Sequence, residues 1–218
     1  MTLVPVKTPW VVKKTFPNYI WDVATNEKVI YLTFDDGPTP DITEWTLNIL
    51  KTYKAKATFF CIGNNIEKHP DIFQQILKQG HAIGNHTYNH AKGWKTNTAN
   101  YCKEVDRTQV LINSCTPPQT QQQGHLFRPP YGQIKPKQAK ELIASGYKII
   151  MWDVISFDWD KDIPEETCFE NVKNNAVNGS IVVFHDSIKA SKNMLFALPK
   201  VLEYYSNLGY TFKSLKYN

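Results

Sequence analysis

The feature that most constrains this chain is a regular alternation of two kinds of segment. From residue 28 onward, short apolar runs rich in β-branched residues alternate with longer runs whose apolar residues recur at helical spacing. Each helical crossover returns the chain to the same side of a sheet, so this order predicts parallel strands. The runs that we predict to be strands are 28–34, 55–63, 81–85, 125–128, 147–156, 180–186 and 210–215.

The number and composition of these runs narrow the fold class. About seven strands that are apolar throughout are typical of an α/β sheet covered by helices on its faces. A closed (β/α) barrel and a doubly wound sheet both satisfy this pattern. We expect residues 1–27 to form an N-terminal extension packed on this single domain, with a short helix after Pro9, and residues 28–218 to form the domain itself. The helices that we predict inside the domain are 41–53, 70–80, 97–115, 135–146, 165–179 and 193–209.

Composition excludes some classes of function. The net charge is +5 and the lysines are scattered, which argues against a nucleic-acid-binding face. No run of ~18 apolar residues is present, so we expect no membrane span. The N-terminal residues lack a basic segment followed by an apolar one, so we expect a cytoplasmic protein unless a leader was removed. The four cysteines have no close spacing, which predicts reduced thiols.

Unusual polar residues follow five of the predicted strands. In a parallel array the carboxyl ends of the strands share one face, so these side chains are expected to converge there. A functional site at this face is therefore predicted from the order of the segments alone. The residues are Asp35, Asp36, His86, His90, Arg128, Asp153, Asp158, His185 and Asp186.

The stretch "HTYNH" indicates a metal site. His86 and His90 are four residues apart, and on a helical turn their nitrogens would meet at one point. A carboxylate after the first strand would supply a third ligand and leave open positions on a divalent ion, as in catalytic rather than structural sites. Taken alone, "DDGP" at 35–38 also fits a plain turn, and neither carboxylate is singled out as the ligand.

The remaining polar residues suit the other steps of a hydrolysis. The carboxylate that stays off the ion can take a proton from metal-bound water, and Arg128 can hold it by charge-assisted hydrogen bonds. His185 is the natural general acid on the opposite side, because unperturbed histidine titrates near neutral pH. Taken alone, His185 also fits a buried structural histidine. Together these parts suit hydrolysis of a carbonyl-containing bond.

Five motifs resemble those of the NodB-homology polysaccharide deacetylases, carbohydrate esterase family 4. They appear in family order over residues 28–215 as "TFDDG", "HTYNH", "RPPY", "ISFDW" and "VFH". The resemblance implies a distorted (β/α) barrel with residues 28–218 as its catalytic domain and the site at the C-terminal ends of the strands. Two motifs depart from the family pattern, with Ile155 at a common Asp position and Val183 at a Leu position. Asp153 is a possible substitute for the missing carboxylate.

The resemblance also implies a role for each site residue. Asp35 is implied as the catalytic base and Asp36 as a metal ligand, together with His86 and His90. The ion is expected to be Zn²⁺, with Co²⁺, Ni²⁺ or Mn²⁺ as alternatives that suit the same ligands. The other implied roles are Arg128 orienting the base, the Tyr131 backbone N–H stabilising the oxyanion, Asp158 tuning the acid His185, and Trp159 and Val183 lining the acetyl pocket.

The function implied is metal-dependent removal of N-acetyl groups from glycans that contain GlcNAc or MurNAc. Two alternatives stay open. One is an O-deacetylase of acetylated polysaccharide such as xylan. The other is a non-catalytic sugar-binding relative, against which the intact set of Asp35, Asp36, His86 and His90 argues. We expect a monomer whose partner is its N-acetylated glycan substrate.

Overall fold

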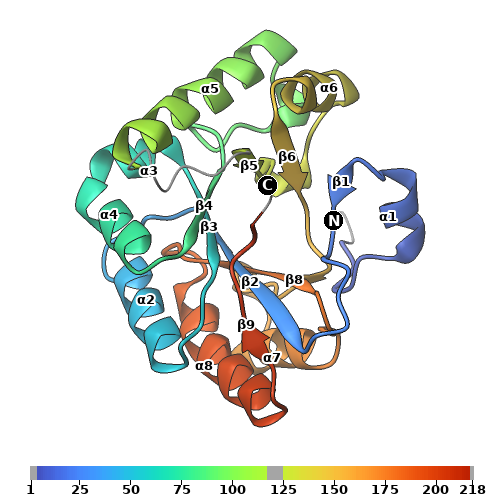
Figure 1. The fold of residues 1–218 in the computed structure, drawn as a ribbon, viewed down its shortest axis with the longest axis vertical. Helices are drawn as coiled ribbons and strands as arrows, with labels where there is room; N and C mark the ends of the chain where they lie inside the picture. The colour runs from blue at the N-terminus through green and yellow to red at the C-terminus, as the bar shows by residue number, and fades with distance from the viewer. Residues whose placement is uncertain (1–3, 117–124, 217–218) are drawn as a thin grey trace.

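A computed structural model describes residues 4–116 and 125–216, and its centre is a curled sheet in which every paired strand is parallel (Figure 1). The strand order is β1-β6-β5-β4-β3-β2-β8-β7, with β9 pairing β2 off this path. The fold is a distorted (β/α) barrel, which confirms the prediction and sets aside the doubly wound sheet. The strands are β1 (Tyr19–Ile20), β2 (Val29–Asp35), β3 (Thr58–Cys61), β4 (Ala82–Asn85), β5 (His125–Phe127), β6 (Tyr147–Ile150), β7 (Val154–Ile155), β8 (Ile181–His185) and β9 (Thr211–Phe212).

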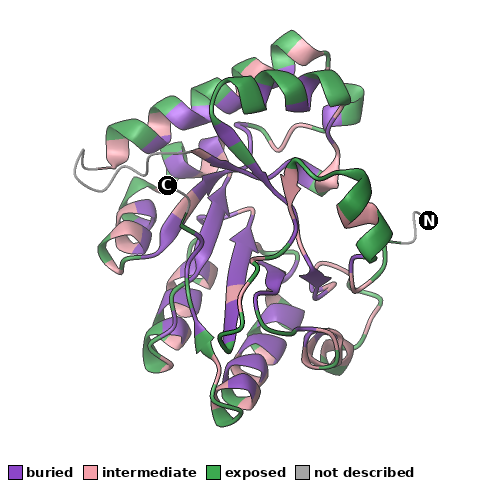
Figure 2. Cartoon of the chain, turned by 45° about the vertical axis from the view of Figure 1, so that its right-hand side comes forward, coloured by how far each residue is buried: buried purple, intermediate pink, exposed green. Residues whose placement is uncertain are grey.

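Helices surround the outside of the sheet (Figure 1), with buried inner faces and exposed outer faces (Figure 2). Local signals place several of their ends as predicted. The Asp41 N–H donates to the Glu44 carboxylate at the start of one helix, and Pro70 begins another. The helices are α1 (Trp10–Thr15), α2 (Ile42–Thr52), α3 (Gly63–Lys68), α4 (Pro70–Lys78), α5 (Thr98–Cys115), α6 (Pro136–Ala144), α7 (Glu165–Lys173) and α8 (Ser191–Asn207), with short 3₁₀ turns η1 (Gly93–Lys95) and η3 (Pro130–Gly132).

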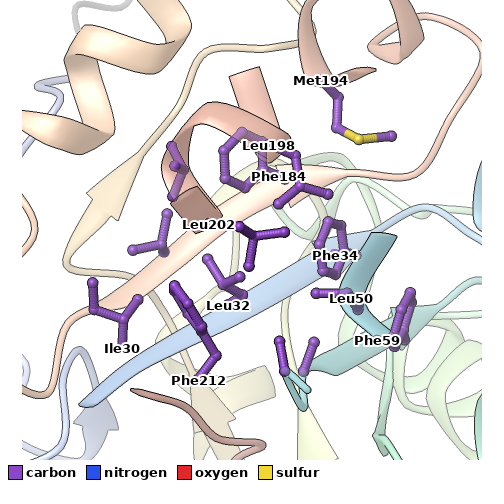
Figure 3. Packing of buried hydrophobic residues seen from close by; sticks show 14 of the residues in the cluster. Ile30, Leu32, Phe34, Leu50, Phe59, Phe184, Met194, Leu198, Leu202 and Phe212 are labelled. Carbon is purple, nitrogen blue, oxygen red and sulfur yellow. The ribbon is translucent and has the colours of Figure 1, made fainter. Parts of the chain in front are cut away.

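Side chains of β2 alternate between the two faces of the sheet and connect the core to the site. Ile30, Leu32 and Phe34 pack outward in the main hydrophobic cluster, against side chains that include Leu198 of α8 (Figure 3). Each fully buried side chain of this kind stabilises the fold by roughly 1.5–3 kcal/mol. The intervening residues face the barrel interior. The packed outer face therefore fixes the direction in which the inner, polar residues point.

The region 147–156, predicted as one strand, is two strands at opposite ends of the sheet. β6 pairs with β5 and β1, whereas β7 pairs with β8. The chain between them, 151–153, crosses from one end to the other, and the backbone N–H of Met151 and of Asp153 bonds to different strands, at Ile20 O and Ile181 O. The single-strand prediction was wrong because a continuous apolar run does not show where its hydrogen-bond partners change.

An N-terminal segment pairs with both ends of the sheet. β1 extends it beside β6, and Lys7 forms an antiparallel bridge with Val154 of β7. The Ile155 N–H donates to Val6 O at 3.0 Å. We call residues 6–8 and 154–155 the seam of the barrel. Closing the barrel thus depends on a segment that lies outside the alternating pattern.

Other features of the chain concern thiols and hydropathy. All four cysteines are free thiols; Cys61 and Cys168 are buried, whereas Cys102 and Cys115 are partly exposed. Among the described residues, no helix has both the length and the apolar character needed to cross a bilayer.

Candidate active site

Asp35 ends β2 on the inner face and is held by a buried arginine. Arg128, which directly follows β5, is fully buried and donates from Nη1 to Asp35 Oδ1 and Thr33 Oγ1, both at 2.7 Å. Its Nε donates to Ile150 O at 3.2 Å and its Nη2 to Met151 O at 2.8 Å. A buried ion pair is favourable when its other hydrogen-bonding groups are also satisfied, and these bonds use four of the five N–H donors of the guanidinium. Asp35 is consequently fixed in orientation.

Asp36 points instead toward two histidines. Its Oδ1 lies 3.3 Å from His90 Nε2 and 3.7 Å from His86 Nε2, and the ligand atoms of the three side chains all lie within 4.8 Å of one another. The Asp36 backbone has φ of 83°, a left-handed conformation that turns its side chain away from the direction of Asp35. Asp36 Oδ1 is buried, yet it has no hydrogen-bond partner among the described residues. A buried acceptor without a donor is costly, and a cation beside it would remove that cost.

The Nε2 atoms of both histidines face this oxygen. Burial lowers the pKa of His86, and burial together with the charge of His86 lowers the pKa of His90 to about 4. Both imidazoles are therefore neutral at neutral pH, the form that binds metals. The His86 Nδ1–H donates to Arg128 O at 2.8 Å, which leaves Nε2 as the acceptor that faces Asp36. The donor set and the unpartnered oxygen fit a divalent ion.

The loop that carries the histidines is not helical, contrary to the interpretation of the His86–His90 spacing. Thr87 and His90 have left-handed φ angles of 63° and 55°. The loop is instead held by α3 and α5: the Gly63 N–H donates to Thr87 O at 3.0 Å, and the Asn89 N–H donates to Glu104 at 2.7 Å. The two rings still meet, with centroids 5.0 Å apart. External anchors, rather than a helical turn, bring them together.

His185 lies beside Asp35. The two residues are register partners on the neighbouring strands β2 and β8. The His185 Nδ1–H donates to Asp158 Oδ1 at 2.8 Å, and its backbone N–H donates to Asp158 Oδ2 at 2.6 Å. Burial opposes protonation, but the carboxylates of Asp158 and then Asp36 outweigh it and raise the pKa of His185 to about 9. His185 is therefore protonated at neutral pH and ready to donate from Nε2.

The residues expected to contact the substrate, at the oxyanion or in the acetyl pocket, lie around the same point. The Tyr131 ring lies 4.5 Å from that of His90, and the Trp159 ring lies 4.9 Å from that of His185. Val183 is buried two residues before His185 on β8 and therefore shares its face of the strand. With the exception of Asp153, the predicted site residues thus come to the C-terminal edge of the barrel.

Asp153 has a different environment and does not replace the carboxylate that Ile155 lacks. Its side chain is bound by Lys7 at 2.8 Å, Lys13 at 2.6 Å and the Ser180 hydroxyl at 2.5 Å. These contacts tie the N-terminal segment to the sheet. Asp153 is consequently a structural residue of the seam region, and Ile155 is a buried apolar side chain beside Val183.

Asp186 is a residue of the site to which the sequence patterns gave no role. It is fully buried, and its carboxylate accepts the Gly37 N–H at 3.1 Å and the Thr43 hydroxyl at 2.5 Å. Its own N–H donates to Asp35 O at 3.1 Å. Burial raises the pKa of Asp186 to about 8. The turn after β2 is thus fastened to β8, but its partner Thr43 is 143 residues away, too far for a local pattern to indicate.

Comparison with known proteins agrees with this site. The fold and the paired acid and base define a hydrolase. The profile of the family described as polysaccharide deacetylase matches residues 22–150. The chain belongs to the polysaccharide deacetylase family, as the five motifs predict.

Several relatives are named for their substrates. The chain is 36% identical over 198 residues to a peptidoglycan-N-acetylglucosamine deacetylase of Bacillus cereus, covering 88% of each chain. It is 32% identical over 191 residues to the peptidoglycan-N-acetylmuramic acid deacetylase PdaC of Bacillus subtilis, covering 86% of this chain and 38% of that protein. The crystal structure of the Bc1960 peptidoglycan N-acetylglucosamine deacetylase superposes with a TM-score of 0.85 at 32% identity, covering 95% of both chains.

Proposed function

We propose that this chain is a metal-dependent deacetylase that removes the N-acetyl group from GlcNAc residues of a peptidoglycan-type glycan. The observation that carries the proposal is the unpartnered Asp36 Oδ1, which faces two neutral histidines between a fixed carboxylate and a protonated histidine. Asp36, His86 and His90 would hold the ion. A divalent ion in that position supplies Lewis acidity toward the amide carbonyl.

The side chains that surround the triad divide the proton transfers between them. Asp35, held by Arg128 through one oxygen, accepts a proton from the attacking water at its other oxygen. The Tyr131 backbone N–H donates to the oxyanion that develops on the former carbonyl oxygen. His185 gives its Nε2 proton to the leaving amine as the carbon–nitrogen bond breaks. The products are acetate and the free amino sugar.

The base and the acid are each paired with an oppositely charged side chain. The Arg128 guanidinium holds Asp35, the proposed proton acceptor, by an ion pair at 2.7 Å. The Asp158 carboxylate favours a protonated His185, which must donate a proton. Because Asp35 and His185 are register partners on adjacent strands, they flank the same substrate atom from neighbouring positions. This arrangement suits an amide, whose amine leaves only after protonation.

Two relationships favour GlcNAc in peptidoglycan as the substrate. The B. cereus relative named for that sugar covers 88% of this chain, and the Bc1960 structure matches over 95% of it. The relative named for N-acetylmuramic acid is less similar, at 32% identity. We propose zinc as the ion, because two histidines and one carboxylate form a ligand set typical of catalytic zinc.

Acetate release tests the proposal directly. The purified chain would be incubated with peptidoglycan, chitooligosaccharides and acetylxylan, before and after chelation and with Zn²⁺, Co²⁺, Ni²⁺ or Mn²⁺ added back. We expect acetate from peptidoglycan and from GlcNAc oligomers, loss of activity on chelation, and recovery with added metal. Asp35→Asn should abolish release, whereas Asp22→Asn on the far N-terminal segment serves as the matched control. Release only from acetylxylan would favour the O-deacetylase, and full activity without metal would refute the role of the ion.

A further inference from the structure

A rigid aromatic surface lies beside the proposed reaction site and has no part in the chemistry described above. It consists of residues 92–94, which follow the histidine loop, and we call it the Trp94 shelf. The Trp94 side chain is 59% exposed. Tyr131, whose ring contacts Lys92 of the shelf, is 54% exposed. Single exposed apolar residues are common on proteins and need no explanation. The shelf differs from such residues in how it is held.

Hydrogen bonds with residues 134–138, which lie before α6 and in its first turn, hold the shelf and the nearby Thr96 in place. The Trp94 indole N–H donates to Ile134 O at 3.3 Å. The buried amide of Gln138 donates to Gly93 O at 2.9 Å and to Thr96 O at 3.1 Å, and Lys135 Nζ donates to Thr96 O at 2.8 Å. The segment 133–138 begins two residues after Tyr131 and continues into the first turn of α6. Trp94 is therefore held by the segment that follows Tyr131, so ligand binding would require little ordering of its indole ring.

A glycine makes the close approach of the shelf and segment 133–138 possible. A side-chain carbon built on Gly93 would lie 2.1 Å from Gln133 O, far inside contact distance. The shelf backbone can therefore lie against segment 133–138 only with glycine at this position. The exposed indole is the outcome of a tightly packed backbone and is not a loose surface side chain.

The shelf also carries the cation of Lys92. Lys92 is exposed, its Nζ lies 4.9 Å from the centre of the Tyr131 ring, and within residues 4–116 and 125–216 it forms no ion pair. The Tyr131 ring in turn lies 4.5 Å from His90, a proposed metal ligand. Because Trp94 is four residues beyond His90, their Cα atoms are at most ~14 Å apart. That distance is within reach of a short oligosaccharide.

We propose that the Trp94 shelf binds the saccharide next to the GlcNAc being deacetylated, and that Lys92 pairs with a carboxylate carried by that saccharide. This inference rests on the proposed function. The C–H face of a pyranose ring stacks on a flat indole, and the fixed ring gains this contact without losing rotamer freedom. The ammonium makes the subsite selective for an acid-substituted glycan over a neutral one. The acid is a lactyl group or a peptide attached to it.

Binding measurements on a catalytically silent background test the shelf separately from the chemistry. In Asp35→Asn protein, calorimetry would compare chitotetraose, a GlcNAc–MurNAc tetrasaccharide with free lactyl acids, and the same tetrasaccharide bearing stem peptides. We expect Trp94→Ala to weaken binding of all three about tenfold. Lys92→Met should weaken binding of an acidic ligand about threefold, remove its salt dependence, and leave chitotetraose unchanged. If Lys92→Met weakens binding of the tetrasaccharide with free lactyl acids, the partner of Lys92 is the lactyl carboxylate. If it weakens binding of the peptide-bearing ligand alone, the partner is a carboxylate of the peptide.

The chain contains a matched control on α1. Trp10 is 65% exposed and Lys14 Nζ lies 4.3 Å from its ring centre, so the pair repeats the chemistry of the shelf away from the site. Trp10→Ala should leave binding unchanged, and thermal unfolding would show that each variant is folded. If Trp94→Ala and Trp10→Ala bind the glycans equally well, the proposal that the Trp94 shelf binds saccharide is wrong, even if the wild type releases acetate. Conversely, selective loss in Trp94→Ala without acetate release from any glycan would refute the proposed function and support the subsite.

Discussion

Two parts of the site are built on opposite principles. The pairs Arg128–Asp35 and Asp158–His185, which we call the closed pairs, satisfy their charges within the protein at 2.7 and 2.8 Å. The triad of Asp36, His86 and His90, which we call the open triad, leaves a buried oxygen without a donor and two neutral histidines facing it. The closed pairs are complete as they stand, whereas the geometry of the open triad is consistent with a metal site.

The difference teaches which residues serve stability as well as catalysis. Removing one member of a closed pair leaves a buried charge without its partner, which is costly to the fold. Removing a member of the open triad takes away a group that is poorly satisfied without an ion. We therefore expect the two parts to respond to mutation in different ways, and the following changes test that contrast from the largest expected effect to the smallest.

Loss of the open triad should affect activity most and stability least. We expect Asp36→Ala to lower kcat/KM for acetate release by about 10⁴-fold, because the transition state loses the support of the ion. The free energy of unfolding of the metal-free protein should change by less than about 1 kcal/mol, since the lost carboxylate oxygen had no donor. Asp22→Ala, in the N-terminal segment, is the control for loss of a carboxylate. A variant that keeps its activity would contradict the role of Asp36.

Removing one member of a closed pair should lower the stability of the fold strongly, unlike the loss of Asp36. Arg128→Met removes four hydrogen bonds and leaves Asp35 buried without a cation, so we expect the free energy of unfolding to fall by about 3–5 kcal/mol. Urea unfolding measures this loss. The double variant Arg128→Met, Asp35→Asn should recover part of it, because the unpaired charge is then absent. No recovery would mean that the packing of Arg128, and not its charge, dominates.

Adding the ion should stabilise the open triad and leave the closed pairs unaffected. At a free Zn²⁺ concentration of 100 times the Kd, binding to the folded state contributes about 2.7 kcal/mol. We expect Tm to rise accordingly in the wild type and in Asp158→Asn, but not in His86→Ala. The site should release the ion when the pH falls toward the pKa of His90, about 4, because a protonated imidazole cannot bind metal. An equal rise of Tm in His86→Ala would place the ion elsewhere.

Weakening the Asp158–His185 pair should change the pH above which activity is lost. Its effect on the rate at neutral pH should be smaller than that of the changes above. His185 is active when protonated, so activity should fall as pH rises through about 9. Its pKa exceeds the unfolded value of about 6.5, so its contribution to stability is full below that pH and is lost as pH rises toward 9. In Asp158→Asn the effect of burial on the pKa of His185 is no longer offset by the Asp158 charge, so the fall of kcat at alkaline pH should occur at lower pH. If the fall occurs at the same pH as in the wild type, it is caused by a group other than His185.

Much of the fold and site could be predicted because local patterns carry it. Apolar runs and helix-end signals located most of the strands and helices, although β1 and α3 were not predicted. The rule for parallel strands placed most of the polar residues at one edge. The family motifs then separated Asp35 from Asp36, a distinction that the spacing could not make. Their different environments now have a physical basis in the left-handed backbone at Asp36 and in Arg128.

What could not be predicted depends on contacts between distant residues. The break between β6 and β7 follows from a change of strand partners, which an apolar run does not record. The conformation of the loop at 86–90 depends on anchors such as Glu104 in α5. The role of Asp186 depends on its hydrogen bond from Thr43 of α2. In each case the residue types were visible in the sequence, but the partner that determines the geometry was not.

The seam also sets an order of events in folding. Lys7 and its partner Asp153 are separated by 146 residues, whereas strands such as β3 and β4 pair across a single helical hairpin. Loop closure over so long a separation is entropically costly before other contacts have formed. We therefore expect the other strands to assemble first into an open sheet, to which residues 6–8 bind later to close the barrel. A chain cut near residue 7 would then still form its hydrophobic core but would leave the barrel open.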